Sequence, residues 1–248
     1  MKHTQKGLTL IELMVALLLG LIFSAAAFQL LLTNQRTFEL QQTLASLQED
    51  GQMALRYMSA DIRNAGRGNI LQGTIPPVIL DSTSTHGHSQ NGTSHDELVI
   101  QYFGTSDCQG TTDSSEVEII NRYYVNGGRL LCSGSLSAGT VELLNGVDSF
   151  QIQYGLDTDK DENLGVTRFV NASATMLDAS DEDTDDAPVL VAIRLAILLS
   201  SEELNQQTPN SSSTHYVLDQ QVTSPSDRRI RRVFSTTVHI RNYDSEEV

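Results

Sequence analysis

The sequence predicts an α+β fold, in which one long N-terminal helix precedes a domain of antiparallel strands. The segment 13–32 is apolar except for Ser24 and Gln29, and an apolar stripe of helical period continues to Ile62. From residue 97 onward, short runs rich in Val, Ile, Tyr and Phe alternate with turn signals. Strands that follow one another after a single helix indicate an α+β fold, because parallel strands would need crossover helices between them.

The start of this helix has the length of a membrane span. About twenty apolar residues reach ~30 Å, the thickness of the bilayer core. Lys2 and Lys6 precede the run, so the positive-inside rule places the leader in the cytoplasm and the rest outside. Glu12 is a lone carboxylate at the mouth of the run, where it costs at least about 2.5 kcal/mol. A retained anchor that uses Glu12 is favoured over a signal peptide cut near 25–27, because the apolar pattern continues through 28–32.

The helix is expected to continue beyond the membrane as an amphipathic segment over 34–66. Its apolar positions recur at spacings of three and four: Leu40, Leu44, Leu47, Gly51, Ala54, Met58 and Ile62. The predicted stop is the segment 64–68, with Gly66 or Gly68 as the C-cap.

Residues 67–248 are expected to form a β-rich globular domain. Asn126, Gly127 and Gly128 form a hairpin signal between two of its runs. The expected strands are 97–103, 117–125, 129–132, 141–144, 150–154, 189–199 and 233–240. Residues 70–97, 155–188 and 200–227 are expected to be loops.

The two cysteines of the chain, Cys108 and Cys132, favour a disulfide. An outward-facing domain lies in an oxidising compartment, and two cysteines without a nearby histidine make a poor zinc site. A loop of roughly 25 residues closed in this way contributes ~3 kcal/mol in the chain-entropy model.

Residues 6–15, which read Lys-Gly-Leu-Thr-Leu-Ile-Glu-Leu-Met-Val, resemble the class III signal of type IV pilins and type II secretion pseudopilins. The resemblance implies that a prepilin peptidase removes the leader 1–7 by cutting between Gly7 and Leu8, and that Leu8 is then N-methylated. The segment 8–33 would be the transmembrane and filament-core helix. Glu12 would pair with the ammonium group of Leu8, on its own chain or on a neighbour, and so set the register between subunits. Leu8 stands where most members have phenylalanine, and the anchor has no proline, so the helix should be less kinked.

Patches at 121–125, 144–154 and 232–242 are similar to PilW-type minor pilins and to the related J-type pseudopilins. This resemblance implies a type IV pilin-like fold and a structural subunit that primes or caps a filament with other minor pilins and the major pilin. Its further partners would be the peptidase and the inner-membrane assembly platform. It would reside in the inner membrane with a periplasmic domain and then in the pilus at the cell surface. Adhesion, twitching motility and DNA uptake would be outcomes of the whole pilus.

Two other functions stay open at this point. The first is a J-type pseudopilin at the tip of a type II secretion pseudopilus; the domain size, the cysteine pair and the ending 236–242 favour the pilus instead. The second is a membrane-tethered periplasmic enzyme. His215, Asp219 and the many serines form no recognisable nucleophile signature, so we expect no enzymatic activity.

The charge of the chain is strongly negative, at −15. Without residues 1–7, 14 Lys and Arg face 31 Asp and Glu, which gives −17. Such a surface is unsuited to nucleic acid as a primary ligand.

Four clusters invite a ligand. Asp157, Asp159, Asp161 and Asn163 place oxygen atoms at alternate positions, as calcium loops do, but the EF-hand pattern fails. The hypothesis for this loop is a calcium site, the alternative is a solvated acidic turn, and a calcium-dependent melting temperature would distinguish them. The acidic run 178–186 and the histidines His86, His88 and His95 read as polar loops. A basic cluster of Arg228, Arg229, Arg231 and Arg232 reads as an edge-strand charge pattern.

Overall fold

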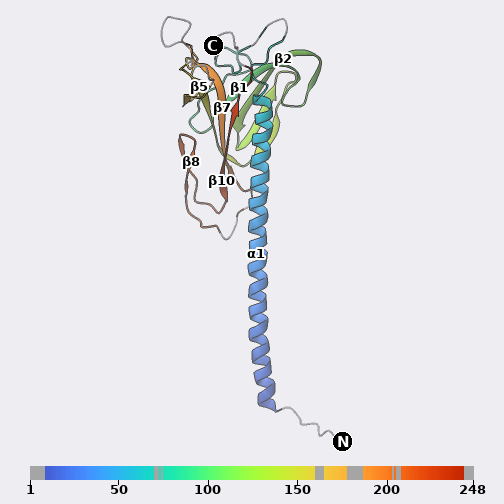
Figure 1. Cartoon of the computed structure of the whole chain (residues 1–248). Coiled ribbons are helices and arrows are strands. Elements are labelled where there is room, and N and C mark those ends of the chain that lie inside the picture. The colour runs from blue at the N-terminus through green and yellow to red at the C-terminus, as the bar shows by residue number, and fades with distance from the viewer. Residues whose placement is uncertain are drawn as a thin grey trace. The chain divides into compact units, whose positions relative to one another are not determined.

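The computed structural model describes residues 9–69, 73, 75–159, 165–177, 187–202, 204 and 208–242 (Figure 1). One helix, α1 (Leu10–Ile62), precedes the strands of the domain. These are β1 (Leu98–Ser106), β2 (Thr112–Asn126), β3 (Arg129–Gly134), β4 (Val141–Asn145), β5 (Val147–Asp157), β6 (Arg168–Val170), β7 (Val189–Ser200), β8 (Thr214–Val217), β9 (Gln220–Thr223) and β10 (Arg231–His239). The expected α+β class is confirmed. The chain divides into two units, Met1–Ala45 and Ser46–Val248.

The first unit contains the apolar part of α1. Among the described residues, α1 is the helix long and apolar enough to cross a membrane, with a mean hydropathy of 2.4 over its most apolar 18-residue window. Two of its polar side chains bond to the helix itself, since the hydroxyls of Ser24 and Thr33 donate to the carbonyl oxygens of Gly20 and Gln29 at 2.8 and 2.9 Å. Hydroxyls bonded in this way remain compatible with a hydrocarbon environment.

The second unit is built on antiparallel sheets that share one core with the last turns of α1 (Figure 1). One sheet has the order β1-β2-β3-β4, another β10-β7-β5-β6, and β8 and β9 form a two-stranded hairpin. The helical stripe is buried from Leu47 onward, as expected: Leu47, Gly51, Ala54, Leu55, Met58 and Ile62. Both larger sheets contribute to the same core, for example through Tyr123 of β2 and Phe150 of β5.

The helix ends at Ile62, and turns follow through residue 66. Gly66 has a φ of +79°, so this position suits glycine. Its N–H does not bond to a helix carbonyl, as a C-cap would; it donates to the carbonyl oxygen of Gln101 in β1 at 2.9 Å. Gly66 therefore joins the end of the helix to the edge of a sheet, a role that differs from the predicted cap.

Each strand expected from the sequence is present, with bounds shifted by a few residues. The turn between β2 and β3 has positive φ at both Gly127 and Gly128, as a two-residue hairpin requires. The strands β6, β8 and β9 lie in segments that were expected to be loops, so that expectation was wrong for these residues. They are three or four residues long, too short for a periodic signal. Val217 of β8 packs with Leu218 and Val222 on Ala196 and Leu198 of β7, and so covers a second apolar patch.

Candidate functional site

The carboxylate of Glu12 lies in the first turn of α1. Its backbone N–H faces the hydroxyl of Thr9 at 3.4 Å, and the N–H of Leu13 donates to the carbonyl oxygen of Thr9 at 3.2 Å, so Thr9 caps the helix. No cation among the described residues pairs with Glu12. The predicted cleavage and methylation positions, Gly7 and Leu8, lie outside the described residues. The pairing of Glu12 with an ammonium group therefore stays a prediction.

The last turn of α1 is fixed to β2 by a polar network. Oδ2 of Asp61 accepts hydrogen bonds from the hydroxyl of Tyr123 at 2.6 Å and from Nδ2 of Asn121 at 2.8 Å. Burial raises the pKa of Asp61, against the effect of these hydrogen bonds. No local sequence pattern predicts this network, because Asp61 is about sixty residues from both of its partners.

The predicted disulfide is present and lies beside this network. Cys108 and Cys132 are bonded, with 6.3 Å between their Cα atoms. The N–H of Cys108 donates to Oδ1 of Asn121 at 3.1 Å, and its carbonyl oxygen accepts from the hydroxyl of Tyr57 in α1 at 2.6 Å. The bridge thus ties the β1–β2 loop to β3 at the point where the helix packs.

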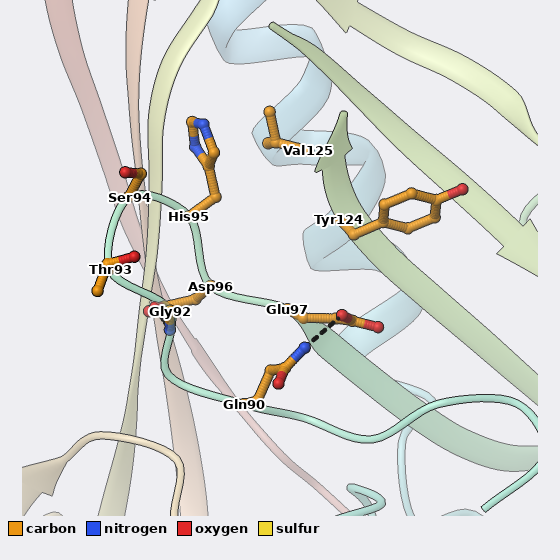
Figure 2. Close-up of a pocket in the computed structure, with 9 residues that line it drawn as sticks. All are labelled: Gln90, Gly92, Thr93, Ser94, His95, Asp96, Glu97, Tyr124 and Val125. Carbon is orange, nitrogen blue, oxygen red and sulfur yellow. Dashed lines mark hydrogen bonds between the residues drawn. The ribbon is translucent and has the colours of Figure 1, made fainter. Parts of the chain in front are cut away.

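A shallow hollow of about 350 Å³ lies between the start of β1 and the end of β2 (Figure 2). Its lining consists of Gln90, Gly92, Thr93, Ser94, His95, Asp96, Glu97, Tyr124 and Val125. The polar groups are largely engaged with each other. Nε2 of Gln90 donates to Oε2 of Glu97 at 2.8 Å, and the other oxygen of Glu97 pairs with Arg122.

Asp96 of this hollow is a structural carboxylate. Its oxygens accept from the backbone N–H groups of Gly92 and Ile152 at 2.9 and 2.7 Å, which fastens the loop to β5. The side chain is buried, and this burial raises the pKa of Asp96 to about 6, despite the two hydrogen bonds.

The consecutive residues Ser94, His95 and Asp96 do not form a catalytic triad. Figure 2 shows the His95 ring turned away from the Gln90–Glu97 pair. Nδ1 of His95 is buried without a partner, so Asp96 does not orient the imidazole as a triad requires. Burial also lowers the pKa of His95.

The structure places only part of the predicted calcium loop. Asp157 is buried, and its oxygens accept from the N–H groups of Asp159 and Gly165. Asp161 and Asn163 lie outside the described residues, as does the whole acidic run 178–186. Within the part of the chain that is described, no three metal-ligating side chains come together, the histidines His86, His88 and His95 included. The calcium hypothesis stays a prediction.

The basic cluster at 228–232 separates into two kinds of arginine. Arg231 is buried and bidentate to Asp227, at 2.6 and 2.7 Å, and its Nε bonds Asp148 at 2.5 Å. These hydrogen bonds lower the pKa of Asp227 to about 2. Nη1 of Arg229 donates to the carbonyl oxygen of Ser201. Arg228 and Arg232 remain exposed.

Most of the β-rich domain matches the profile of a known protein family. The profile of the family described as type IV pilus-assembly protein W, PilW, matches residues 101–242, which is more than half of the chain. The chain belongs to the PilW family. The resemblance seen in the sequence is confirmed, and as a member of a structural pilin family the chain is not an enzyme.

A second family model matches the N-terminal part of the chain. The prokaryotic N-terminal methylation motif matches residues 2–28, the segment that includes Gly7, Leu8 and Glu12. Together with the apolar start of α1, this match indicates a membrane-anchored pilin. The structure is similar to a type IV-like pilin from Thermus thermophilus, with a TM-score of 0.48, 14% identity, and coverage of 79% of this chain and 96% of that chain. No curated protein sequence matches the chain.

Proposed function

We propose that this PilW-family chain is a minor pilin that primes or caps the type IV pilus together with other minor pilins. It is made as a prepilin, cut between Gly7 and Leu8, methylated on Leu8 and held in the inner membrane with its domain in the periplasm. From there it enters the filament next to the major pilin. The family match over 101–242 supports the pilus over the type II secretion alternative, because the matching family is described by its role in pilus assembly.

The observation that carries this proposal is Glu12. It is the only charged side chain in the described segment 9–35, and it lies in the first helical turn among exposed apolar residues. A charge in that position is costly unless it is paired. The ammonium group at Leu8, created by the cut, lies one helical turn away and supplies the partner within one chain or between neighbours.

The test replaces Glu12 in the full chain in its own cells. Glu12→Ala and Glu12→Gln are expected to be processed and anchored normally but to enter sheared filaments at least about tenfold less, because the carboxylate that sets the register is missing. Glu12→Asp keeps the charge and should retain partial incorporation. Normal incorporation of Glu12→Ala would show that the carboxylate does not pair subunits.

A further inference from the structure

The strand β10 is an open edge of the sheet β10-β7-β5-β6. It pairs with β7 over nine consecutive residue pairs without a bulge. Ser201 N–H donates to the carbonyl oxygen of Ile230, and Ile240 N–H donates to that of Val191. In an antiparallel pair, alternate residues bond to the neighbour, so even-numbered residues of β10 face β7. The N–H and C=O groups of Val233, Ser235 and Thr237 therefore face away from the sheet.

No described residue supplies a backbone partner for these outward groups. The corresponding edge of β1 shows the contrast. It is covered by Gly66, Pro77 and Ile79, with hydrogen bonds from Gly66 to Gln101, from Ile79 to Val99 and from Gln101 to Pro77. The other edge strands among those described, β4, β6, β8 and β9, have only three to five residues each. Since proteins normally protect long edges, nine uncovered residues indicate a pairing surface.

The composition of β10 also favours pairing. Residues 233–238 read Val-Phe-Ser-Thr-Thr-Val, with no charge, proline or lysine to discourage another strand. Val233 is 40% exposed and Ser235 and Thr237 are exposed, while Phe234 and Val238 pack inward. The backbone is accessible, and the opposite face is held rigidly by the core.

The charges at the two ends of β10 indicate which kind of strand can pair with this edge. Arg228, Arg232 and Arg241 are exposed and have no ion-pair partner among the described residues. Two copies related by a two-fold axis would pair antiparallel, which brings Arg228 and Arg232 of each against the His239 and Arg241 end of the other. Like charges at both ends disfavour that dimer, whereas an acidic strand complements both.

We propose that β10 accepts an extended acidic segment of a different polypeptide, which adds as a fifth strand to this sheet. Main-chain hydrogen bonds at Val233, Ser235 and Thr237 provide the affinity, and the flanking arginines provide the selectivity. This surface deepens the proposed function, on which it rests for the presence of partner subunits in one assembly.

The test uses the full chain in its own cells, with a photoreactive phenylalanine analogue in place of Val233. Irradiation should cross-link the chain to a peptide of another polypeptide that contains Asp or Glu, as read by mass spectrometry. Ser235→Pro removes one outward N–H and should lower the cross-link yield at least about tenfold. Ser235→Ala, the matched control, keeps the N–H and should cross-link as the parent does.

Several outcomes would overturn the proposal: a cross-link to residues 243–248 of the same chain, one to a second copy, no cross-link at all, or an unchanged yield in Ser235→Pro. If the Ser235→Pro chain fails to accumulate, Arg232→Glu replaces it as the test variant, since this substitution alters only an exposed side chain. An unchanged cross-link yield in Arg232→Glu would also overturn the proposal. If Glu12→Ala and the parent enter filaments equally while the cross-link behaves as expected, the proposed register function fails and the β10 surface remains.

Discussion

Asp96 illustrates how one buried carboxylate holds a loop against a sheet. It accepts two backbone hydrogen bonds that join the loop at Gly92 to Ile152 in β5, yet its burial outweighs them and raises its pKa to about 6. The folded state therefore binds a proton at a pH where the unfolded state has already lost it. The protonated form of Asp96 costs less to bury, although the charged form accepts the stronger hydrogen bonds from Gly92 and Ile152.

The predicted consequence is a stability that depends on pH through this residue. Between about pH 4 and pH 6 the folded chain keeps a proton on Asp96 that the unfolded chain lacks, so this contribution grows as pH falls and is lost as pH rises through 6. The free energy of unfolding of the parent minus that of Asp96→Asn should increase by on the order of 2 kcal/mol from pH 7 to pH 4. Urea unfolding followed by tyrosine fluorescence measures it.

Comparison of the parent with Asp96→Asn also removes the contribution of His95 to the pH dependence of stability. The lowered pKa of His95 acts in the opposite direction below pH 6.5, but it acts in both chains and cancels in the difference. A difference that stays constant with pH would mean that Asp96 titrates in the folded chain as it does in the unfolded chain.

At the scale of elements, the helix α1 meets β10 at one close approach. A Cβ added at Gly51 would lie 2.6 to 2.8 Å from ring carbons of Phe234. Glycine in mid-helix costs about 1 kcal/mol relative to alanine, so its use here follows from packing and not from helix formation.

Replacement of this glycine should therefore destabilise the domain. Gly51→Ala gains helix propensity but forces the Phe234 ring to move, and we expect a net loss of about 1 to 3 kcal/mol in the free energy of unfolding. The neighbouring exposed change Gln52→Ala should alter it by less than about 0.5 kcal/mol. Urea unfolding of both variants and the parent in detergent measures these changes in the free energy of unfolding. Equal stability of Gly51→Ala and the parent would show that the ring yields without cost.

At the scale of the whole molecule, the chain combines an apolar helix with a domain of high negative charge. The methylation motif over 2–28 and the PilW profile over 101–242 lie in different parts of the chain, and both indicate a pilin. We therefore expect the helix α1, which carries Glu12 in its first turn, to persist in the mature protein.

The mature chain should begin at Leu8 and carry one added methyl group on its α-amino nitrogen. Mass spectrometry of the protein isolated from membranes and from filaments measures both properties. Loss of Lys2 and Lys6 with the leader gives a formal charge of −17, so native electrophoresis should show the same shift. A mature chain that begins near residue 28 would remove the anchor and with it the filament function.

Much of this fold could be predicted because its signals are local. The apolar stripe to Ile62, the β-branched runs and the glycine pair at 127 and 128 each depend on neighbouring residues, whose spacing alone limits the backbone. The disulfide could be predicted for a different reason, since the chain has only Cys108 and Cys132 to pair. The short strands β8 and β9 lacked such a signal, because their turn at Leu218 and Asp219 has neither glycine nor asparagine.

By itself the sequence determined the helix, most strands, the cysteine pair and the pilin-type N-terminus. Only the tertiary structure decided which strand is an open edge, which carboxylates are buried and which arginines stay unpaired. Asp96 meets Ile152, and Arg231 meets Asp148, across separations of 56 and 83 residues. Their burial and pairing follow from which strands come together, and no local pattern of residues encodes that choice.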